Sequence, residues 1–403
     1  MKQGFKKRFL VVMLSLMLMA SSLSGCASGN IKESDKVESQ TAKTPGQSTY
    51  ESDVQSSENE VQNTSEDAEG KASGAVELSA VSTEEAPKKK IENYRNNEDG
   101  HHEFQPHVFS KKYLEYHGEG VMQSFFNMVD ALRAGEDTFE CTDENAYGWC
   151  TGGRLINFFF PVATDCIQPM QGTGTDAFKN GVGKINYLIP KEEFLERERQ
   201  FEEMVVSILN NCVSDDYDDF ETCLSLYEYI TMNYKYDYYV YEHLNDLPFD
   251  YTSTYRCFTE KKGICCEIAG MYNYLLLQCG VDSEESGGDH REIESHAWVF
   301  VTIDGESYHI DPTWGLTYKY APLTYFMMTD KIRDTRDGFP VEKMDIGGGG
   351  DESRKLFDFH ATDDRYQELW EGNYMGMDRE NKKIIYFLYD EDDRKEFYYG
   401  GEG

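Results

Sequence analysis

Three side chains in the second half of the sequence are of types that together can transfer an acyl group. They are the thiol of Cys265, the imidazole of His296 and the carboxyl group of Asp311. A thiolate can attack a carbonyl carbon, a neighbouring imidazole can carry the proton, and a carboxylate can hold that imidazole in one tautomer and orientation. This chemistry requires that the elements around the three residues bring them within hydrogen-bond reach of one another.

The sequence around His296 and Asp311 predicts a β-hairpin that places these two residues side by side. Residues 304–305 are Asp-Gly, a pair typical of a two-residue type I′ turn, and alternating segments flank it. Such a turn pairs Ile303 with Glu306, and side chains two residues apart share a face. His296 and Asp311 then become diagonal neighbours within reach of a carboxylate–imidazole hydrogen bond. The alternating segments are 294–303 and 307–313.

Cys265 is expected at the start of a helix that ends at Cys279 and Gly280. A glycine suits the helix exit, and the apolar residues before it recur at helical spacing. At a helix start the dipole and a nearby imidazolium lower a thiol pKa, and free backbone N–H groups can stabilise an oxyanion. Cys266 is an alternative nucleophile, but its side chain points about 100° further around the helix.

The histidines also raise the possibility of a zinc site. His290, His296 and His309 could act together with Asp289 or Asp311, since His309 is expected on the same face as His296. The sequence contains no His-x-x-x-His or Cys-x-x-Cys pair that would support such a site. We therefore expect no metal and no organic cofactor.

The motifs around the three residues resemble those of the transglutaminase-like (papain-like cysteine protease) superfamily over about 150 residues. They are Gly263-Ile264-Cys265 followed by Ala269, His296-Ala297-Trp298, and Asp311-Pro312-Thr313-Trp314. The resemblance implies that Cys265 is the nucleophile, His296 the base and Asp311 the residue that orients it. The next segment, Cys266-Glu267-Ile268, departs from the small or Gln-Gly-Tyr segment usual in the family, so the substrate is not implied.

The resemblance also implies a fold and a class of reaction. The fold class is α+β, with a papain-like/transglutaminase-like core whose catalytic cysteine starts a helix packed on an antiparallel sheet. The reaction is transfer of an acyl group from a peptide or glutamine amide through a thioester on the enzyme, with hydrolysis favoured over crosslinking. Two rivals remain open, namely a catalytically inactive surface binding module of the same fold and a zinc-binding domain.

Other segments have patterns that predict further helices and strands. Apolar residues at helical spacing predict three helices, and β-rich runs predict three strands. The helices are expected at 121–135, 194–212 and 220–233, and the strands at 184–189, 384–389 and 395–399.

The amino terminus has the order of features found in an export signal. Basic residues precede an apolar run at 9–20, which is too short to span a bilayer. Residues 23–26, Leu-Ser-Gly-Cys, resemble the bacterial lipobox, and the resemblance implies that Cys26 is lipid-modified. We therefore expect an extracytoplasmic protein anchored to the bacterial cell membrane through this lipid, and nine remaining cysteines that are mostly buried thiols.

Length, composition and charge suggest how the chain is divided and which partners it has. A chain of 403 residues exceeds one ordinary domain, and its polar segment up to about residue 100 cannot bury enough apolar surface to fold. A net charge of −35 repels phosphate backbones, so we expect a protein or peptide substrate and no nucleic acid. The expected parts are a signal peptide at 1–25, a disordered tether at 26–100, an α+β lead-in at 101–195, the catalytic domain at 196–345 and a β-rich extension at 346–403.

Overall fold

The computed structural model describes residues 101–169, 176–248, 251–292, 295–317, 319–346, 360–389 and 394–400. All of them belong to one compact unit that begins at Glu85. The expected signal peptide, Cys26 and the tether at 26–100 lie outside the described residues. No helix within these ranges is long and apolar enough to cross a membrane.

A four-stranded antiparallel sheet lies at the centre of the molecule, with the strand order β8-β7-β6-β9. The hairpin β7–β8 has the predicted register, because Ile303 pairs with Glu306. Asp304 and Gly305 between them have φ of 54° and 85°, the left-handed values that a type I′ turn requires. The strands are β6 (Asp282–Gly288), β7 (His296–Ile303), β8 (Glu306–Ile310) and β9 (Met344–Ile346).

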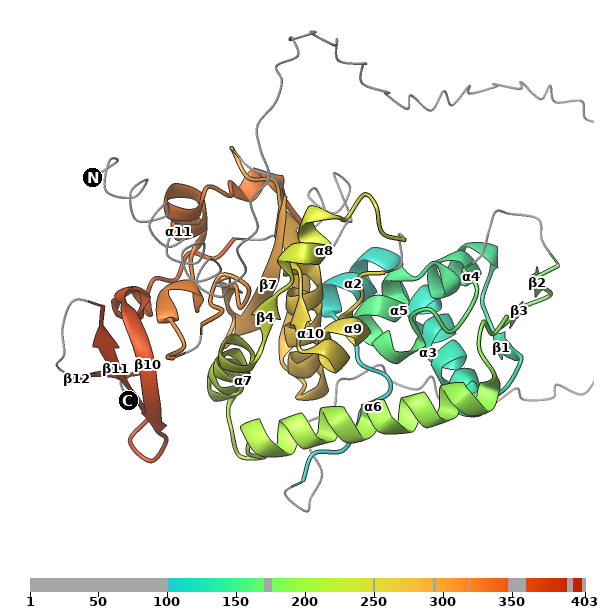
Figure 1. The fold of residues 1–403 in the computed structure, drawn as a ribbon, viewed down its shortest axis with the longest axis horizontal. Helices are drawn as coiled ribbons and strands as arrows, with labels where there is room; N and C mark the ends of the chain where they lie inside the picture. The colour runs from blue at the N-terminus through green and yellow to red at the C-terminus, as the bar shows by residue number, and fades with distance from the viewer. Residues whose placement is uncertain are drawn as a thin grey trace, which may run out of the picture. The chain divides into compact units, whose positions relative to one another are not determined.

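Helix α10 (Cys265–Gln278) packs against strands β6 and β7, and Figure 1 shows it beside β7. It begins and ends where the sequence predicts. Its apolar side chains, including Ile268, Tyr272 and Leu275, are fully buried. Helix α7 (Asp219–Asn233), also predicted, packs on α10, and the Tyr272 hydroxyl donates to the Cys223 carbonyl at 2.8 Å.

The region that precedes the core forms a helical layer with a small sheet in the order β1-β3-β2 (Figure 1). Its helix α3 confirms the predicted helix at 121–135. The strand predicted at 184–189 is wrong, because β3 ends at Lys184 and its partner β1 offers only three residues to pair with. Beyond this point only Tyr187 forms a bridge, to Ile167. The elements are α2 (Lys111–His117), α3 (Glu119–Arg133), β1 (Thr138–Glu140), α4 (Glu144–Thr151), α5 (Arg154–Phe159), η1 (Pro161–Ala163), β2 (Phe178–Lys179) and β3 (Val182–Lys184).

The long helix α6 (Lys191–Cys212) joins the lead-in region to the core. Its Phe201 ring packs edge-on against Phe104 before it in the chain and against Phe258 after it, with centroids 6.2 and 5.2 Å away. The expected division at residues 195 and 196 therefore falls inside a continuous helix. The described residues on both sides of it share one hydrophobic core.

The remaining elements connect the core and extend it at the carboxyl end. The strands predicted at 384–389 and 395–399 are confirmed as β11 and β12, which form an antiparallel sheet with β10. Two short strands, β4 and β5, pair in parallel, and β5 comes just before α10 in the chain. These elements are β4 (Lys235–Tyr236), α8 (Tyr238–Glu242), α9 (Thr254–Glu260), β5 (Lys262–Gly263), η2 (Leu323–Tyr325), α11 (Asp330–Ile332), the π-helical turn η3 (Arg333–Asp337), η4 (Val341–Lys343), η5 (Gln367–Glu371), β10 (Gly372–Asp378), β11 (Lys383–Leu388) and β12 (Arg394–Tyr398).

Candidate active site

The structure places Cys265 at the first residue of α10, as predicted. The N–H group of Ile264, just before the helix, donates to the Glu267 carboxylate at 2.9 Å. This bond fixes the direction in which the chain enters the helix. The first N–H groups of α10 have no acceptor within the helix, because every α-helix leaves them unpaired at this end. They are therefore suited to stabilise negative charge beside the Cys265 thiol.

A buried network of charges holds the start of α10 in place. Glu267 accepts hydrogen bonds from the Ser253 N–H at 2.9 Å and from Arg256 Nε at 2.8 Å. Arg256 also donates to the Asp237 carboxylate at 3.0 Å. Helix α9 and the end of β4 are thus tied to the residues around Cys265. In the sequence Glu267 lies in the segment that departs from the family pattern, and the structure shows that it anchors the start of α10.

His296 and Asp311 lie together at the edge of the hairpin, as the predicted register requires. The Nε2 atom of His296 is 2.8 Å from Oδ2 of Asp311. Asp311 is fully buried, and its other oxygen accepts the Trp314 N–H at 3.1 Å. Since Nε2 of His296 is occupied by Asp311, the other ring nitrogen is left for the thiol. This is the arrangement that a base and its orienting residue need.

A buried arginine that sequence reasoning missed completes the Asp311 site. Arg333 donates to Asp311 Oδ2 at 3.2 Å and to Asp337 at 3.1 Å, and its side chain is fully buried. Its guanidinium lies over the Trp298 ring, 4.2 Å from the centroid, a favourable cation–π position. A single arginine in a short π-helical turn carries no motif, so no signal in the sequence could have found it.

The Cys265 thiol and the His296 imidazole are hydrogen-bond partners. Three neighbours stabilise the Cys265 thiolate: the Cys266 thiol, the His296 imidazolium and the Ala297 N–H. Burial acts in the opposite direction, but these groups hold the pKa of Cys265 well below its usual value. In contrast, the pKa of Cys266 is raised, because Cys266 hydrogen-bonds the Cys265 thiolate and is buried. The electrostatics therefore agree with the choice of Cys265 over Cys266.

The charges of His296 and Asp311 complete this picture. Burial lowers the pKa of His296, but the Asp311 carboxylate and the Cys265 thiolate outweigh burial and raise it to about 9. The pKa of Asp311 is lowered despite its burial, because His296 and Arg333 both stabilise the carboxylate. At neutral pH the site therefore holds a thiolate–imidazolium pair whose cation is fixed by a buried carboxylate.

His309, the other histidine on this face, has a separate role. Its Nδ1 atom accepts the Trp298 indole N–H at 3.0 Å, and its Nε2 atom lies 2.9 Å from the Asp330 carboxylate. With both ring nitrogens engaged, His309 has no lone pair to offer zinc. Within the described ranges, no group of three or more His, Cys, Asp or Glu side chains is placed to hold a metal ion.

Cys265 and His296 line a cleft of about 1130 Å³, and the lead-in region forms one of its walls. This wall comes from α4 and α5, where Gly153, with φ of 88°, allows the sharp turn between the two helices. The Asn157 side chain accepts the Thr254 N–H at 2.8 Å and so ties the wall to α9. The lead-in residues on the cleft include Glu144, Trp149, Arg154, Asn157, Phe158 and Thr164.

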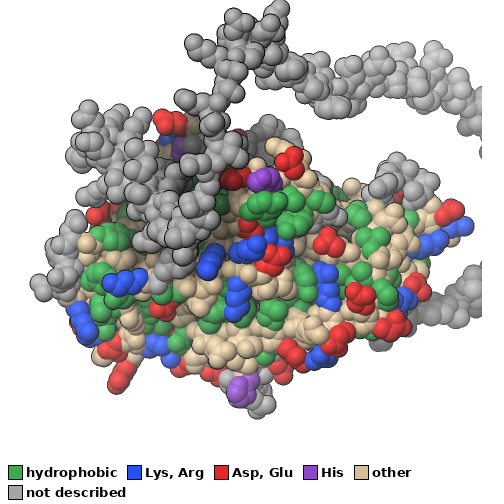
Figure 2. Space-filling model, in the orientation of Figure 1, with side chains coloured by type: hydrophobic (Ala, Val, Ile, Leu, Met, Phe, Trp, Pro, Cys, Tyr) green, Lys and Arg blue, Asp and Glu red, His purple; other side chains and the backbone are tan. Residues whose placement is uncertain are grey.

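The mouth of the cleft carries exposed apolar side chains from α8 and the turn after it. Tyr241 and Leu244 line the cleft, with exposed fractions of 43% and 39%. In Figure 2 a group of hydrophobic side chains lies at the position that α8 occupies in Figure 1.

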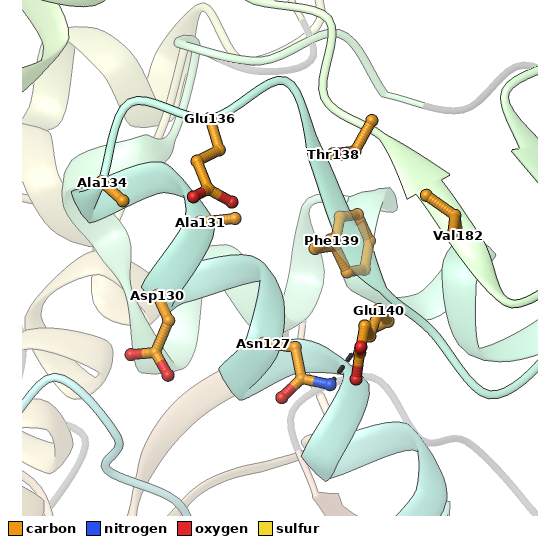
Figure 3. Close-up of a pocket in the computed structure, with 9 residues that line it drawn as sticks. All are labelled: Asn127, Asp130, Ala131, Ala134, Glu136, Thr138, Phe139, Glu140 and Val182. Atoms are coloured by element: carbon orange, nitrogen blue, oxygen red, sulfur yellow. Dashed lines mark hydrogen bonds between the residues drawn. The ribbon is translucent and has the colours of Figure 1, made fainter.

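A second cavity, of about 480 Å³, lies between α3 and the small sheet, away from Cys265 (Figure 3). Carboxylates from Asp130, Glu136 and Glu140 line it, and Asn127 donates to the Glu140 carbonyl at 3.0 Å. Its lining contains no thiol and no imidazole. This cavity therefore lacks the groups required for acyl transfer.

Residues 206–312 match the sequence model of the transglutaminase-like superfamily. The chain contains a transglutaminase-like domain. The matched range contains Cys265, His296 and Asp311, and the expected fold class is confirmed, since a cysteine starts a helix packed on an antiparallel sheet. The matched range does not contain Arg333 or the cleft wall formed by α4 and α5.

Three solved structures are similar to parts of this chain. A TGase is 16% identical, with a TM-score of 0.27 over 32% of this chain and 35% of its own. A putative cysteine protease from Cytophaga hutchinsonii is 17% identical, with a TM-score of 0.23 over 31% and 40%. LapG of Legionella pneumophila, treated with EGTA, is 14% identical, with a TM-score of 0.20 over 30% and 62%. The chain thus spans less than two thirds of each, and no curated protein sequence matches it.

Proposed function

We propose that this protein is a cysteine enzyme that transfers acyl groups from peptide or glutamine side-chain amides. Cys265 is the nucleophile, His296 the general acid and base, and Asp311 the residue that orients His296. One observation carries the proposal. One ring nitrogen of His296 lies 2.8 Å from Asp311 in a hydrogen bond, and the same imidazole interacts with the Cys265 thiol. The transglutaminase-like match over the same residues supports it.

The proposed reaction has two steps. The Cys265 thiolate attacks the amide carbonyl carbon, and the N–H groups at the start of α10 stabilise the oxyanion that forms. The His296 imidazolium gives its proton to the leaving nitrogen, the C–N bond breaks, and a thioester remains on Cys265. The neutral imidazole then accepts a proton from the attacking water or amine, and the thiolate leaves. Asp311 keeps His296 in one orientation through both steps.

We favour hydrolysis over crosslinking as the second step. The cleft of about 1130 Å³ exceeds by far the roughly 30 Å³ that one water molecule occupies in the liquid, so water reaches the thioester unless an amine displaces it. Ammonia release from a glutamine peptide, measured with and without an added primary amine, distinguishes the two. Incorporation of the amine in place of water would overturn this preference.

Alkylation of the thiol tests the nucleophile. The Cys265→Ala variant should lose labelling by an iodoacetamide-type probe at about pH 6, whereas Cys266→Ala, one residue along the same helix, should keep it. Labelling that follows Cys266, or that titrates with the pKa of about 8.5 of an ordinary thiol, would contradict the proposal. The second result would favour the inactive binding module, because such a module has no need of a thiolate.

We also propose that the protein is exported and anchored to the cell membrane through a lipid on Cys26. The basic start, the apolar run and the Leu-Ser-Gly-Cys segment at 23–26 support this location. Cells grown with a labelled fatty acid should transfer the label to the full chain but not to a Cys26→Ala variant, which should leave the membrane fraction. A wild-type chain without label would overturn the proposal.

A further inference from the structure

A second carboxyl group that the reaction does not use is buried at the floor of the cleft. Glu285 lies on β6 opposite Val299 of β7, lines the cleft, and is only 3% exposed. It faces α10, because a Cβ atom built on Gly270 of that helix would lie 3.1 Å from Glu285 Oε2. Gly270 is four residues after Cys266, so both lie on the same side of the helix.

One oxygen of this carboxyl group lacks the hydrogen bond that a buried carboxylate needs. The Oε2 atom has no hydrogen-bond partner among the described residues, and neither has the buried Thr254 hydroxyl, which also lies close to Gly270. A buried carboxylate without a paired cation or donated hydrogen bonds is strongly disfavoured relative to the neutral acid. Burial and the nearby Cys265 thiolate raise the pKa of Glu285 well above its usual value, although Arg154 opposes them.

The ionisable groups around Glu285 come from α5, α10, α2 and β9. Arg154 on α5 favours its charged form, and Cys265 on α10 disfavours it. Its own charge acts on Cys266 of α10 and on the Tyr113 phenol of α2. Asp345 on β9 pairs with Gly287, two residues along the same face. Burial and the Cys265 thiolate outweigh Arg154 and favour a proton on Glu285.

We propose that Glu285 stays protonated in the resting enzyme, so that no second negative charge opposes the thiolate of Cys265. The inference rests on the proposed function, in which Cys265 alternates between thiolate and neutral thioester. By linkage, the interaction is reciprocal. Glu285 holds its proton most tightly beside the thiolate, and releases it to solvent at a lower pH once Cys265 is acylated.

Infrared difference spectroscopy of the full chain tests this directly. A protonated carboxyl group has a C=O band that disappears on ionisation, and its pH midpoint can be followed before and after alkylation of Cys265 by iodoacetamide. Alkylation turns the thiolate into a neutral thioether, as acylation does. We expect the band of Glu285 to be present at neutral pH and its midpoint to fall by about one pH unit after alkylation, the usual scale for loss of a neighbouring like charge.

Two glutamine variants assign the band and keep the test specific. Glu285→Gln should remove the band that responds to alkylation and, because Gln is also neutral, should leave the midpoint of the thiol alkylation profile unchanged. Glu284→Gln is the matched control, because Glu284 is equally buried on the adjacent residue of β6, lies 3.5 Å from Lys112 and does not line the cleft. Burial raises the pKa of Glu284 to about 8, so this variant should remove a different band, one that alkylation does not move.

The contrary results are distinct from a failure of the proposed function. A Glu285 band that titrates with ordinary carboxyl groups, or that ignores alkylation, would overturn the inference even if Cys265→Ala abolishes labelling. A fall of about one unit in the thiol midpoint of Glu285→Gln would show that Glu285 is ionised in the wild type, and would overturn the inference as well. The proposed function fails by itself when labelling survives in Cys265→Ala or titrates like that of an ordinary thiol.

Discussion

Two histidine–aspartate pairs lie close together on the same sheet face, and they differ in chemistry. His296 is 2.8 Å from Asp311, and His309 is 2.9 Å from Asp330, with each pair joined through the Nε2 atom of the histidine. The partner at the other ring nitrogen is different. His296 meets the Cys265 thiol, whereas His309 accepts a hydrogen bond from the Trp298 indole.

The surroundings of each imidazole decide its charge. Despite burial, Asp311 and the Cys265 thiolate raise the pKa of His296 to about 9. For His309 burial dominates, and the Arg333 cation adds to it, so that its pKa is lowered even though Asp330 opposes them. A hydrogen bond to a carboxylate is therefore insufficient to make a histidine reactive. The group on its other side must supply the charge or the proton to be moved.

The largest expected difference between the two pairs is in thiol reactivity. His296→Gln should slow alkylation of Cys265 at about pH 6 by about a hundredfold, because without an imidazolium the thiol returns toward a pKa of about 8.5. His309→Gln should change the rate by less than about threefold, because the Cys265 thiolate does not depend on a charge at His309. Equal effects in the two variants would show that both histidines contribute to the site.

The next largest difference concerns Arg333, the cation that hydrogen-bonds Asp311 of the first pair. Arg333→Met should lower the free energy of unfolding by about 3–5 kcal/mol, because Asp311 and Asp337 would remain buried without it. Arg291→Met is the control, since Arg291 is half exposed and pairs with the partly exposed Asp334. That change should leave the urea unfolding midpoint nearly unchanged, because solvent screens an exposed ion pair. A tolerated loss of Arg333 would mean that Asp311 is stable as a neutral acid.

A smaller effect should separate the hydrogen bonds of the second pair from its packing. Trp298→Phe keeps an aromatic ring in the core but removes the indole N–H that His309 accepts at 3.0 Å. We expect a loss of about 1–3 kcal/mol in urea unfolding, because His309 Nδ1 would be buried without a donor. Stability equal to that of the wild type would show that water or another donor replaces the indole.

The two pairs should also change the pH dependence of stability, with opposite signs. The folded pKa of His296, about 9, is above its unfolded value near 6.5, so its contribution is complete below pH 6.5 and disappears between 6.5 and 9. The folded pKa of His309 is below that value, so its contribution is present above pH 6.5 and is lost as the pH falls. His296→Gln should therefore flatten the alkaline side of the profile and His309→Gln the acid side. Profiles that change on the same side would contradict the assignment.

Local sequence patterns were sufficient to predict the hairpin and the start of α10. The Asp304-Gly305 turn fixed the register because its two left-handed residues admit one way of pairing the strands, and His296 and Asp311 followed from it. The strand predicted at 184–189 failed because strand propensity requires a partner, and β1 ends after three residues. The catalytic roles of the three residues remain predictions.

The parts of the site that could not be predicted come from contacts between distant segments. Arg333 and Glu285 are single charged residues, and without a structure each is indistinguishable from a surface residue. Their burial follows from the packing of η3 and β6 against the core. The role of the lead-in region was likewise invisible, since nothing near Trp149 or Asn157 points to a residue more than a hundred positions away.

The position of α4 and α5 along the cleft separates two properties of the proposed enzyme. Cys265, His296 and Asp311 lie within residues 206–312, whereas the wall of the cleft includes Trp149 and Asn157. For the proposed reaction, substitutions in that wall should alter which polypeptides are accepted more than they alter bond cleavage. Two proteins identical over residues 206–312 could therefore process different targets.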